Sequence, residues 1–445
     1  MKRLFCGNAL VIVYKDAMES SSSLMVTNEK PPTAVSVLAS SALRPYTVLR
    51  VFLPFIISIL RDFRRCLFFG GPRVLTEEQE RLRAKQFISK VITLGPTFVK
   101  FGQILAVRDD LLPRLYTDLL KDMHDKIPSF PFEDVHRIIE SEFNRSLSDI
   151  FESFDPVPIA GASLGQVHRA IYQGHDVAVK VLRPGVSQLV ATDMRVIRVL
   201  LSFARAIFGR HFIIRNLSTI VDEFSRVIKD EMDFEMEAKN YEIIAENLKS
   251  NSNVFIPGIY HDVTSKSVLT MDFVDGVRLD NVEVVETRVV NPMSLIKTLV
   301  QVYTQMIVID GVTHADPHPG NLLLDAQGRI VMLDFGMVIR LSSETRHELI
   351  RTINAAVHAD VDRMVQGFYK LDMVTPGTNY VVLRDAAQVL LDITLKTKMS
   401  TGHIIQKMVT DILSSFYRFP LHLPSSLVYL LRIATILEGL GITYD

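Results

Sequence analysis

The chain has 445 residues, of which 48% are apolar and 22% are charged, and its formal net charge at pH 7 is −1. This length exceeds that of a usual single domain, and the near-zero charge argues against nucleic acid as the main partner. The cysteines, Cys6 and Cys66, are too few and too far apart for a disulfide framework or a cysteine-based metal site. A reducing compartment is therefore expected.

The N-terminal region contains two segments of different character. Residues 1–45 are expected to be poorly ordered, because serine and proline clusters break any periodicity. The apolar run near their start is too short and too interrupted to predict a signal peptide. Residues 46–60 are largely apolar, but Arg50 and Pro54 interrupt them, so they are not expected to span a bilayer. Flanking arginines, against the single acid Asp62, suit a membrane surface. The alternative is a helix packed in the core with its arginines in solvent, and the pattern does not decide between the two.

A strand with a lysine near its end follows a loop of small residues. The loop, 158–167, holds only two glycines, Gly161 and Gly165, so it differs from the G-x-G-x-x-G of ordinary kinases, although small residues still let a backbone approach phosphates. The strand, Val177–Val181, alternates as a half-buried strand does and carries Lys180. In kinases a lysine at this place pairs with the α- and β-phosphates of ATP. The alternative is an ordinary surface lysine on an edge strand.

Such a lysine needs a carboxylate on a nearby helix. Residues 222–247 are rich in acids and helix formers and predict that helix. Its candidate carboxylates are Glu231, Asp233, Glu235 and Glu237. The gap between Lys180 and this helix is far longer than in ordinary kinases, and apolar residues at helical spacing fill 187–208. The small lobe is therefore expected to carry a helical insertion.

The strongest chemical pattern lies in Thr313–Asn321, followed by Val331–Gly336. An Asp with an Asn five positions on, then Asp-Phe-Gly after an apolar strand, is typical of the magnesium and phosphate machinery of protein kinases. Asp316 is expected beside the phosphoryl acceptor, whereas Asn321 and Asp334 are expected to hold the metal ions.

Two alternatives compete with this interpretation. Asp-Phe-Gly taken alone is a weak motif that arises by chance. In addition, His314, Asp316 and His318 alternate like the ligands of a hydrolase metal site. That second alternative leaves Asn321 and Asp334 without a role.

The residues around Asp-Phe-Gly predict its setting. Apolar strands at 322–324 and 330–333, joined by a turn at 325–328, are expected to form a hairpin. After Gly336 the chain soon enters a helix whose capped start is expected at Ser343. No long activation segment and no Ala-Pro-Glu intervene. Because protein kinases dock peptides on that segment, the expected acceptor is a small molecule, a lipid or water.

Together these motifs resemble the UbiB-type atypical kinases, a protein-kinase-like family associated with ubiquinone and other prenyl-lipid metabolism. The resemblance covers the chain from about residue 75 to its C-terminus. Its most specific element lies outside ordinary kinases, because Lys100, Gly102 and Gln103 match the family's Lys-x-Gly-Gln motif. Glu231 and Asp233 match its Glu-x-Asp motif.

The resemblance implies roles for these residues. It pairs Lys180 with Glu237, so that Lys180, Glu237 and Asp316 form the catalytic set. It also lets Lys100 reach Glu231, so that the N-terminal extension closes the cleft where a protein kinase would take its peptide. The residues it assigns to regulation are Lys100, Gly102, Gln103, Glu231 and Asp233.

The resemblance further assigns the nucleotide contacts. These are Ala160, Gly161, Ala162, Ser163, Lys180, Met271, Asp272, Phe273 and Val274. The family's loop is usually Ala-Ala-Ala-Ser, and this chain departs from it at Gly161, which gives the backbone more freedom. Lys180, Asp316, Asn321 and Asp334 are all present, so an active rather than a dead kinase is expected.

The expected fold is α+β: a two-lobed protein-kinase-like fold with an N-terminal helical extension and a helical insertion in the small lobe. Residues 1–45 would be a poorly ordered segment, and 46–150 the extension that carries the Lys-x-Gly-Gln motif. The small lobe would span 151–276 and the large lobe 277–445.

The expected function is that of a Mg-ATP-binding atypical kinase or ATPase in isoprenoid-quinone or prenyl-lipid metabolism. ATP and Mg²⁺ are its expected cofactors, a lipid or quinone precursor its ligand, and other proteins of that pathway its partners. One alternative is a small-molecule phosphotransferase of the aminoglycoside or choline kinase type, which shares the His-x-Asp-x-x-x-x-Asn loop but lacks Lys100–Gln103. Another is a nucleotide-switched scaffold without catalysis.

The expected location is either the bacterial cytoplasm and inner-membrane face, or a mitochondrion or plastid. The apolar stretch 427–440 resembles the last helix of the family's catalytic unit, although Arg432 and Glu438 lie within it. No membrane-spanning helices follow it in this sequence, so membrane contact is expected to be peripheral.

Overall fold

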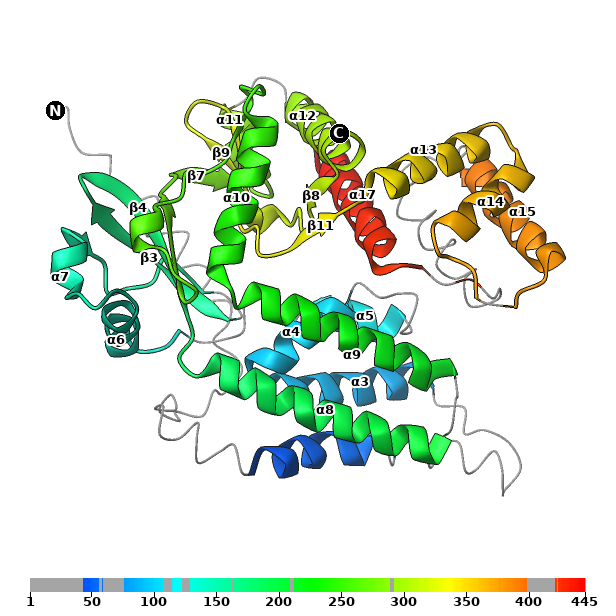
Figure 1. Ribbon diagram of the computed structural model, residues 1–445, viewed down its shortest axis with the longest axis horizontal. Coiled ribbons are helices and arrows are strands. Elements are labelled where there is room, and N and C mark those ends of the chain that lie inside the picture. The colour runs from blue at the N-terminus through cyan, green and yellow to red at the C-terminus, as the bar shows by residue number, and fades with distance from the viewer. Residues whose placement is uncertain are drawn as a thin grey trace.

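The computed structural model describes most of the chain beyond residue 42 (Figure 1). The described residues are 43–55, 58, 76–106, 114–121, 129–161, 164–208, 212–288, 292–375, 377–397, 421 and 423–444. The expectation of poor order for residues 1–45 falls outside the described residues as far as residue 42, whereas residues 43–45 already belong to a helix. Ala162 and Ser163 of the expected nucleotide loop also lie outside the described residues. The fold is α+β and kinase-like, as expected, with a layer of helices below the two lobes in Figure 1.

The small lobe is built on an antiparallel sheet in the order β1-β3-β4-β6, with β2 beside β3. Its strands are β1 (Ser153–Phe154), β2 (Ala160–Gly161), β3 (Gly165–Tyr172), β4 (His175–Leu182) and β6 (Val268–Asp272). Gly165 opens β3 because a Cβ at this position would lie 2.5 Å from the carbonyl oxygen of Val181. Only glycine lets β3 approach β4 this closely. Two residues further along β3, Val167 lies opposite Lys180 of β4.

Two helices, α6 (Phe132–Phe143) and α7 (Leu147–Ile150), pack against this sheet. Val135 and Ile139 of α6 are fully buried in one apolar cluster with Val177 and Val179 of β4. Burying such a side chain contributes roughly 1.5–3 kcal/mol. These helices fall within the range 46–150 expected for the N-terminal extension, yet they share their core with the small-lobe sheet.

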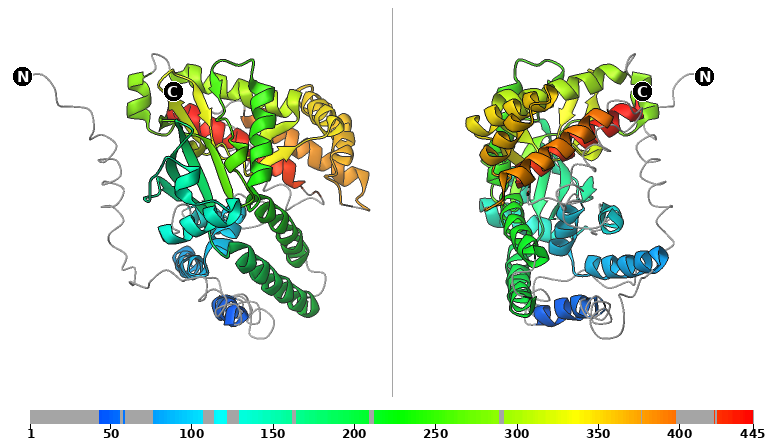
Figure 2. Two further views of the ribbon diagram at one scale, coloured as in Figure 1. Left: turned by 60° about the vertical axis from the view of Figure 1, so that its left-hand side comes forward. Right: turned by 90° about the vertical axis from the view of Figure 1, so that its right-hand side faces the viewer.

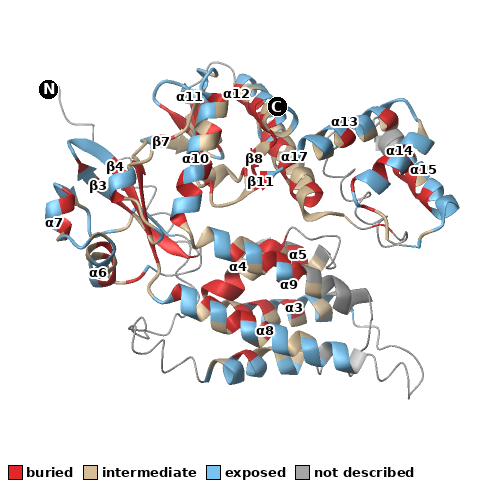
Figure 3. Cartoon of the chain, viewed as in Figure 1, coloured by how far each residue is buried: buried red, intermediate tan, exposed pale blue. Residues whose placement is uncertain are grey.

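The layer of helices below the lobes comes from two distant parts of the chain (Figure 1). The N-terminal part supplies α3 (Glu77–Ile92), α4 (Pro96–Leu105) and α5 (Arg114–Lys121), and the insertion after β4 supplies α8 (Val186–Phe208) and α9 (Phe212–Glu231). Figure 3 shows buried residues on these helices where they face one another. Phe101 of α4 packs on Phe224 of α9, with ring centroids 4.9 Å apart. The expected insertion is thus a helical hairpin that packs against the extension.

The acid-rich helix expected over 222–247 is in fact two helices. α9 ends at Glu231, and α10 (Phe234–Leu248) begins after Asp233. Asp233 separates them because its carboxylate accepts the N–H of Met236 at 3.2 Å and caps α10. Glu231 and Glu237 therefore lie on different helices, whereas the expectation placed them on one.

The large lobe contains a sheet in the order β5-β10-β9-β7 and a second sheet that pairs β8 with β11. The bounds are β5 (Val254–Phe255), β7 (Gly276–Arg278), β8 (Val312–His314), β9 (Leu322–Asp325), β10 (Ile330–Met332) and β11 (Val338–Arg340). The expected hairpin is present as β9 and β10, with Leu323 opposite Val331 and Gly328 in the turn at a φ of 79°. Since β8 pairs with β11, the loop after β8 and the Asp-Phe-Gly segment before β11 lie side by side.

The helices of the large-lobe part of the chain are α11 (Val282–Arg288), α12 (Pro292–Thr304), α13 (Ser343–Val357), α14 (Val361–Lys370), α15 (Tyr380–Thr397) and α17 (Ser425–Thr443). The π-helix η2 (Gln305–Asp310) continues α12, the 3-10 turn η3 (Pro319–Asn321) precedes β9, and the 3-10 turn η1 (His261–Val263) lies beside β6 of the small lobe. α13, α14 and α15 build an apolar core of their own at the right of Figure 1. Ser342 caps α13, one residue earlier than expected, because its hydroxyl accepts the N–H of Thr345 at 3.0 Å.

By length and hydropathy alone, α17 is the one helix within the described part of the chain that is suited to crossing a membrane. In the structure its side chains Tyr429, Ile433, Leu437 and Leu440 are buried in the main apolar core. It packs against α12 and β11, and Figure 2 shows it (red) beside the large lobe from two sides. The apolar stretch 427–440 thus belongs to the large lobe.

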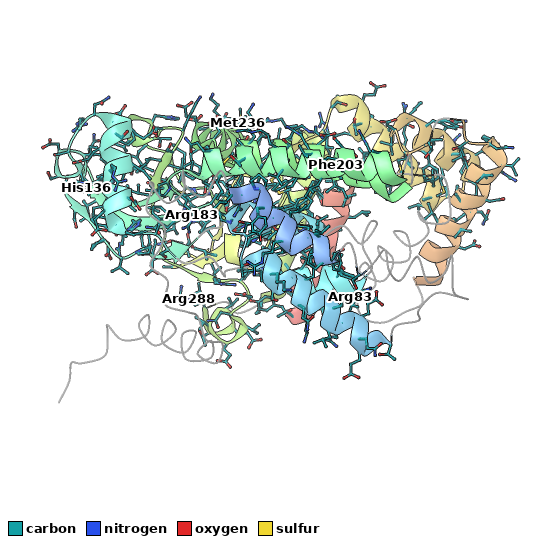
Figure 4. The ribbon with its side chains drawn as sticks, turned by 90° about the horizontal axis from the view of Figure 1, so that it is seen from below. Arg83, His136, Arg183, Phe203, Met236 and Arg288 are labelled. Atoms are coloured by element: carbon teal, nitrogen blue, oxygen red, sulfur yellow. The ribbon has the colours of Figure 1, made fainter. Side chains whose placement is uncertain are left out.

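Residues 43–55 form a helix that lies at an angle beside α8, which carries the labelled Phe203 in Figure 4. Arg44 donates from Nε to Oδ1 of Asp193 at 2.6 Å and also binds the carbonyl oxygen of Leu94. Asp193 and Val48 are fully buried. Arg44 is therefore a packed ion-pair partner, not an arginine in solvent, and it joins the N-terminal helix to α8.

We expect Asp193→Ala to destabilise the protein by about 3 kcal/mol, because it leaves the largely buried guanidinium of Arg44 without its counter-charge. Urea unfolding measures the effect. The matched control is Asp176→Ala, which breaks the exposed pair with Arg169 and should cost less than about 1 kcal/mol. Equal losses in the two variants would contradict the structural role of the Arg44 pair.

Candidate active site

The centre of the site is a lysine held between two carboxylates. The Lys180 ammonium of β4 donates to both carboxylate oxygens of Glu237 on α10, at 2.9 Å each. It also lies 3.6 Å from Oδ1 of Asp334, which follows β10. The pair expected from the sequence is therefore present, and it connects the small-lobe sheet, α10 and the Asp-Phe-Gly segment.

The charges of this group are strongly coupled. Burial alone would lower the pKa of the Lys180 ammonium, but Asp334 and Glu237 outweigh burial and raise it, so the lysine stays charged. Burial also opposes ionisation of Asp334, yet Lys180 and then Lys100 hold its pKa at about 2. Burial raises the pKa of Glu237 to about 7 against the attraction of Lys180. Asp334 is thus the permanently ionised carboxylate of the group.

The backbone of Asp334 is held in an unusual conformation. Its φ is 60°, in the left-handed region that glycine, asparagine and aspartate adopt more readily than other residues do. Its N–H donates to the hydroxyl of Tyr241 at 2.9 Å, and its Oδ1 accepts the N–H of Gly336 at 3.2 Å. Phe335 is fully buried, with its ring 4.5 Å from that of Tyr241. The strained turn is thus fixed by packing on α10, and it directs the carboxylate toward Lys180.

His314, at the end of β8, ties the catalytic loop to this turn. Its Nε2 lies 2.9 Å from the carbonyl oxygen of Asp334, and since a carbonyl only accepts, Nε2 carries the proton. Its Nδ1 then accepts the hydroxyl of Tyr303 at 2.8 Å. Both ring nitrogens are committed, so His314 has no lone pair left for a hydrolase metal. The alternative metal site with Asp316 and His318 is therefore wrong.

Asp316 lies in the loop between β8 and η3. Its carbonyl oxygen accepts from Nδ2 of Asn321 at 3.3 Å, which keeps the two expected functional residues of the loop together. Its carboxylate forms an ion pair with Arg432 of α17, with Nη2 and Oδ1 3.0 Å apart. Burial opposes its ionisation, but Arg432 and weaker contributions from His314 and Lys100 lower its pKa overall. Sequence reasoning missed Arg432, since an arginine inside an apolar helix gives no local signal of such a pair.

The N-terminal extension reaches the site through Lys100 of α4. Its ammonium forms an ion pair with Glu231, and both side chains are largely buried. Glu231 lies beside the Asp-Phe-Gly turn, because a Cβ on Gly336 would be 3.6 Å from its Cγ. On the same helix Gly102 is buried and Gln103 is half-buried, whereas Asp233 caps α10. The structure thus brings α4 next to the Asp-Phe-Gly segment, as the resemblance implies.

The residues expected around the nucleotide divide into two groups. Ala160 and Gly161 form β2, are exposed, and pair with Val167 and Gln166 of β3. Met271 and Asp272 end β6, on the strand next to Lys180, and Phe273 and Val274 follow them half-buried.

Asp272 has a structural use within that second group. Its carboxylate accepts the hydroxyl of Tyr260 at 2.9 Å and the N–H of Gly258 at 2.8 Å. These bonds fix the connection between the lobes.

The donor set fits a magnesium ion shared with phosphates. Among the described residues no three His, Cys, Asp or Glu side chains gather into a self-contained metal site. Magnesium in ATP sites needs only one or two carboxylates, because phosphate oxygens and water complete its shell. Asp334, ionised and half-exposed, and Asn321, held beside Asp316, supply such a set.

Comparison with known proteins identifies the family. A model of the ABC1 atypical kinase-like domain matches residues 122–368. The chain belongs to this family of UbiB-type atypical kinases. A Synechocystis protein, sll0005, is 34% identical over 82% of this chain and 53% of its own length. ACTIVITY OF BC1 COMPLEX KINASE 7, chloroplastic, from Arabidopsis thaliana is 31% identical over 87% of this chain and 56% of its own.

This ABC1-family chain spans about half the length of the first of its curated relatives. Among solved structures, the Rv3197–erythromycin complex from Mycobacterium tuberculosis matches with a TM-score of 0.55 and 23% identity, over 83% of this chain and 93% of that one. At this identity the similarity shows the fold alone.

The pKa of His314 leads to a pH prediction. Burial lowers the pKa of its imidazole in the folded protein below the value of about 6.5 expected in the unfolded chain. Its contribution to stability is therefore present above pH 6.5 and lost as the pH falls below it, by up to about 1.4 kcal/mol per pH unit. The stability advantage of wild type over His314→Gln should shrink between pH 7 and pH 5.

Urea unfolding at several pH values tests this. The control is Val381→Ala at an exposed side chain that does not titrate, for which the difference from wild type should stay constant. A constant difference for His314→Gln as well would mean that the buried imidazole is not held neutral.

Proposed function

We propose that this protein binds Mg-ATP and acts as an atypical kinase or ATPase in isoprenoid-quinone or prenyl-lipid metabolism. The observation that carries the proposal is the contact of Lys180 with Glu237 and Asp334, at 2.9 Å and 3.6 Å. An ammonium fixed by a helix carboxylate beside an ionised Asp is the arrangement that kinases use to hold phosphates and metal. Membership of the ABC1 atypical kinase-like family also supports this proposed function.

In this proposal each residue has a separate task. Lys180, oriented by Glu237, contacts the α- and β-phosphates, while Asn321 and Asp334 hold magnesium, which would neutralise phosphate charge when bound. Asp316 orients the acceptor hydroxyl or water and receives its proton. Ala160–Ser163 and Met271–Val274 border the nucleotide.

The acceptor is a small molecule, a lipid or water. Only a short connection follows Gly336, since β11 starts at Val338 and α13 at Ser343. In addition, the pair of Lys100 with Glu231 places α4 at the cleft. The described residues between Gly336 and α13 thus include no long activation segment on which a peptide would dock. We propose that access to the site is regulated by Lys100, Gly102, Gln103, Glu231 and Asp233.

An apolar ligand and a peripheral membrane contact complete the proposal. An apolar groove of about 520 Å³ lies between α12 and α17, lined by residues such as Val300, Ile307 and Leu437, and it suits a prenyl or acyl chain. The chloroplastic and cyanobacterial relatives support a plastid or bacterial location. Other proteins of the pathway are the proposed partners.

We expect Asp334→Asn to weaken Mg-dependent ATP binding by at least about tenfold, because it removes the charge that holds the metal. Asparagine tolerates the φ of 60° as aspartate does, so the fold should survive. Thermal shift titrated with ATP, with and without Mg²⁺, measures the effect, and Asp362→Asn on the surface is the control. Unchanged Mg-ATP affinity would contradict the site. Binding without any turnover in wild type would favour the nucleotide-switched scaffold.

For the membrane contact, the helix of residues 43–55 offers an exposed apolar side. Leu49 and Leu53 are 38% and 43% exposed on it, and Arg50 beside them is exposed as well. We expect Leu49→Glu combined with Leu53→Glu to abolish co-sedimentation with anionic vesicles at low salt, whereas Leu82→Glu at an exposed site of α3 should not. If wild type itself stays in the supernatant, the helix has only a packing role.

A further inference from the structure

The acceptor side of the site contains a cation from the far end of the chain. The guanidinium of Arg432, on α17, lies 3.0 Å from Oδ1 of Asp316, and the two side chains are only 16% and 28% exposed. The sequence does not predict this contact, because Arg432 lies far from Asp316 along the chain and within an apolar helix. A carboxylate buried to this extent needs a nearby positive charge to stay ionised.

The catalytic loop offers histidines near this carboxylate, but their effect on its pKa is weaker than that of Arg432. Residues 314–321 contain no Lys or Arg. The ring of His318 accepts the N–H of Gly320 through Nδ1, and the ammonium of Lys100 is paired with Glu231. Among the lysines and arginines that the structure describes, Arg432 is the one within ion-pair distance of the Asp316 carboxylate.

The helix α17 is anchored both before and after Arg432. Tyr429 and Ile433, its neighbours on the helix, are 5% and 1% exposed, and Leu437 and Leu440 continue the buried stripe. The hydroxyl of Tyr444, just beyond the helix, donates to the carbonyl oxygen of Leu279 and fixes its end. An arginine on a helix anchored in this way is part of a rigid site, not a mobile latch.

We propose that Arg432 is a positioning residue for the reaction at Asp316, an inference that rests on the proposed phosphoryl transfer. Its guanidinium fixes the carboxylate through the ion pair to the buried Oδ1, which has no hydrogen-bond partner, and thereby leaves Oδ2 to face the acceptor. The acceptor oxygen bonds to the γ-phosphorus of ATP, the bond from that phosphorus to the bridging oxygen breaks, and ADP leaves with the bond's electron pair. The acceptor proton passes to Asp316 and then to solvent. Water as acceptor gives phosphate, and an alcohol gives a phosphate ester.

Arg432→Gln tests this role, with kcat and KM for ATP hydrolysis as the readout. We expect kcat to fall about 10- to 100-fold, the usual cost of a misplaced reacting group, with KM for ATP unchanged within a factor of about two. KM should hold because Lys180, Asn321 and Asp334 are untouched. Arg432→Lys should recover at least half of the loss on a logarithmic scale, since it restores the charge without the planar fork. Thr435→Ala on the same helix is the control and should keep wild-type kcat.

Several results would overturn the role. One is a kcat for Arg432→Gln within twofold of the wild-type value. Another is a kcat for this variant above the wild-type value, which would indicate that Arg432 inhibits the enzyme. A third is a KM for ATP that rises in this variant by the same factor as kcat falls. If Arg432→Gln does not fold, Arg432→Lys decides: a kcat lowered about 3- to 10-fold supports the role, and a wild-type kcat contradicts it. Wild type that binds Mg-ATP but turns over none removes the proposed transfer and this role with it. If wild type hydrolyses ATP and Arg432→Gln has the same kcat, the proposed function stands and only the role of Arg432 is contradicted.

Discussion

The burial of charge at one place is the constraint on which the rest of the structure depends. Lys180, Glu237 and Asp334 lie where the two lobes meet, and each is costly to bury without the others. The same pattern recurs around them, because Lys100 neutralises Glu231 and Arg432 neutralises Asp316. Lys180 thus serves both Glu237 and Asp334, while Glu231 and Asp316 each have a cation from another segment of the chain. These charges come together because β4, α4 and α17, which carry Lys180, Lys100 and Arg432, pack around the place where the two lobes meet.

This arrangement explains why the helical layer and α17 belong to the catalytic unit. α8 and α9 hold α4 through apolar contacts such as Phe101 with Phe224, so the ammonium of Lys100 reaches a carboxylate at the end of α9. On the opposite side, the apolar face of α17 fixes Arg432. The helical layer and α17 thus each supply one cation to the site, Lys100 and Arg432.

Much of this was predictable from the sequence, and the remainder was not for physical reasons. The hairpin around Asp334, the lysine strand and the insertion follow from periodicity and motif order, because local pattern determines them. The break at Asp233 was missed because a capping residue and a helix-interior acid look alike in an acid-rich run. Arg432 was missed because its role depends on a tertiary contact between residues far apart in the chain. The use of Asp272 to bind Tyr260 and Gly258 also depends on tertiary packing.

The most direct measurement is an experimental structure of the protein with Mg²⁺ and a non-hydrolysable ATP analogue. The account predicts metal density bound to the side chains of Asp334 and Asn321, phosphates in contact with Lys180, and the terminal phosphate facing Asp316. It also predicts that Lys100 stays paired with Glu231. Nucleotide bound elsewhere, or a metal that does not contact Asp334, would contradict the account.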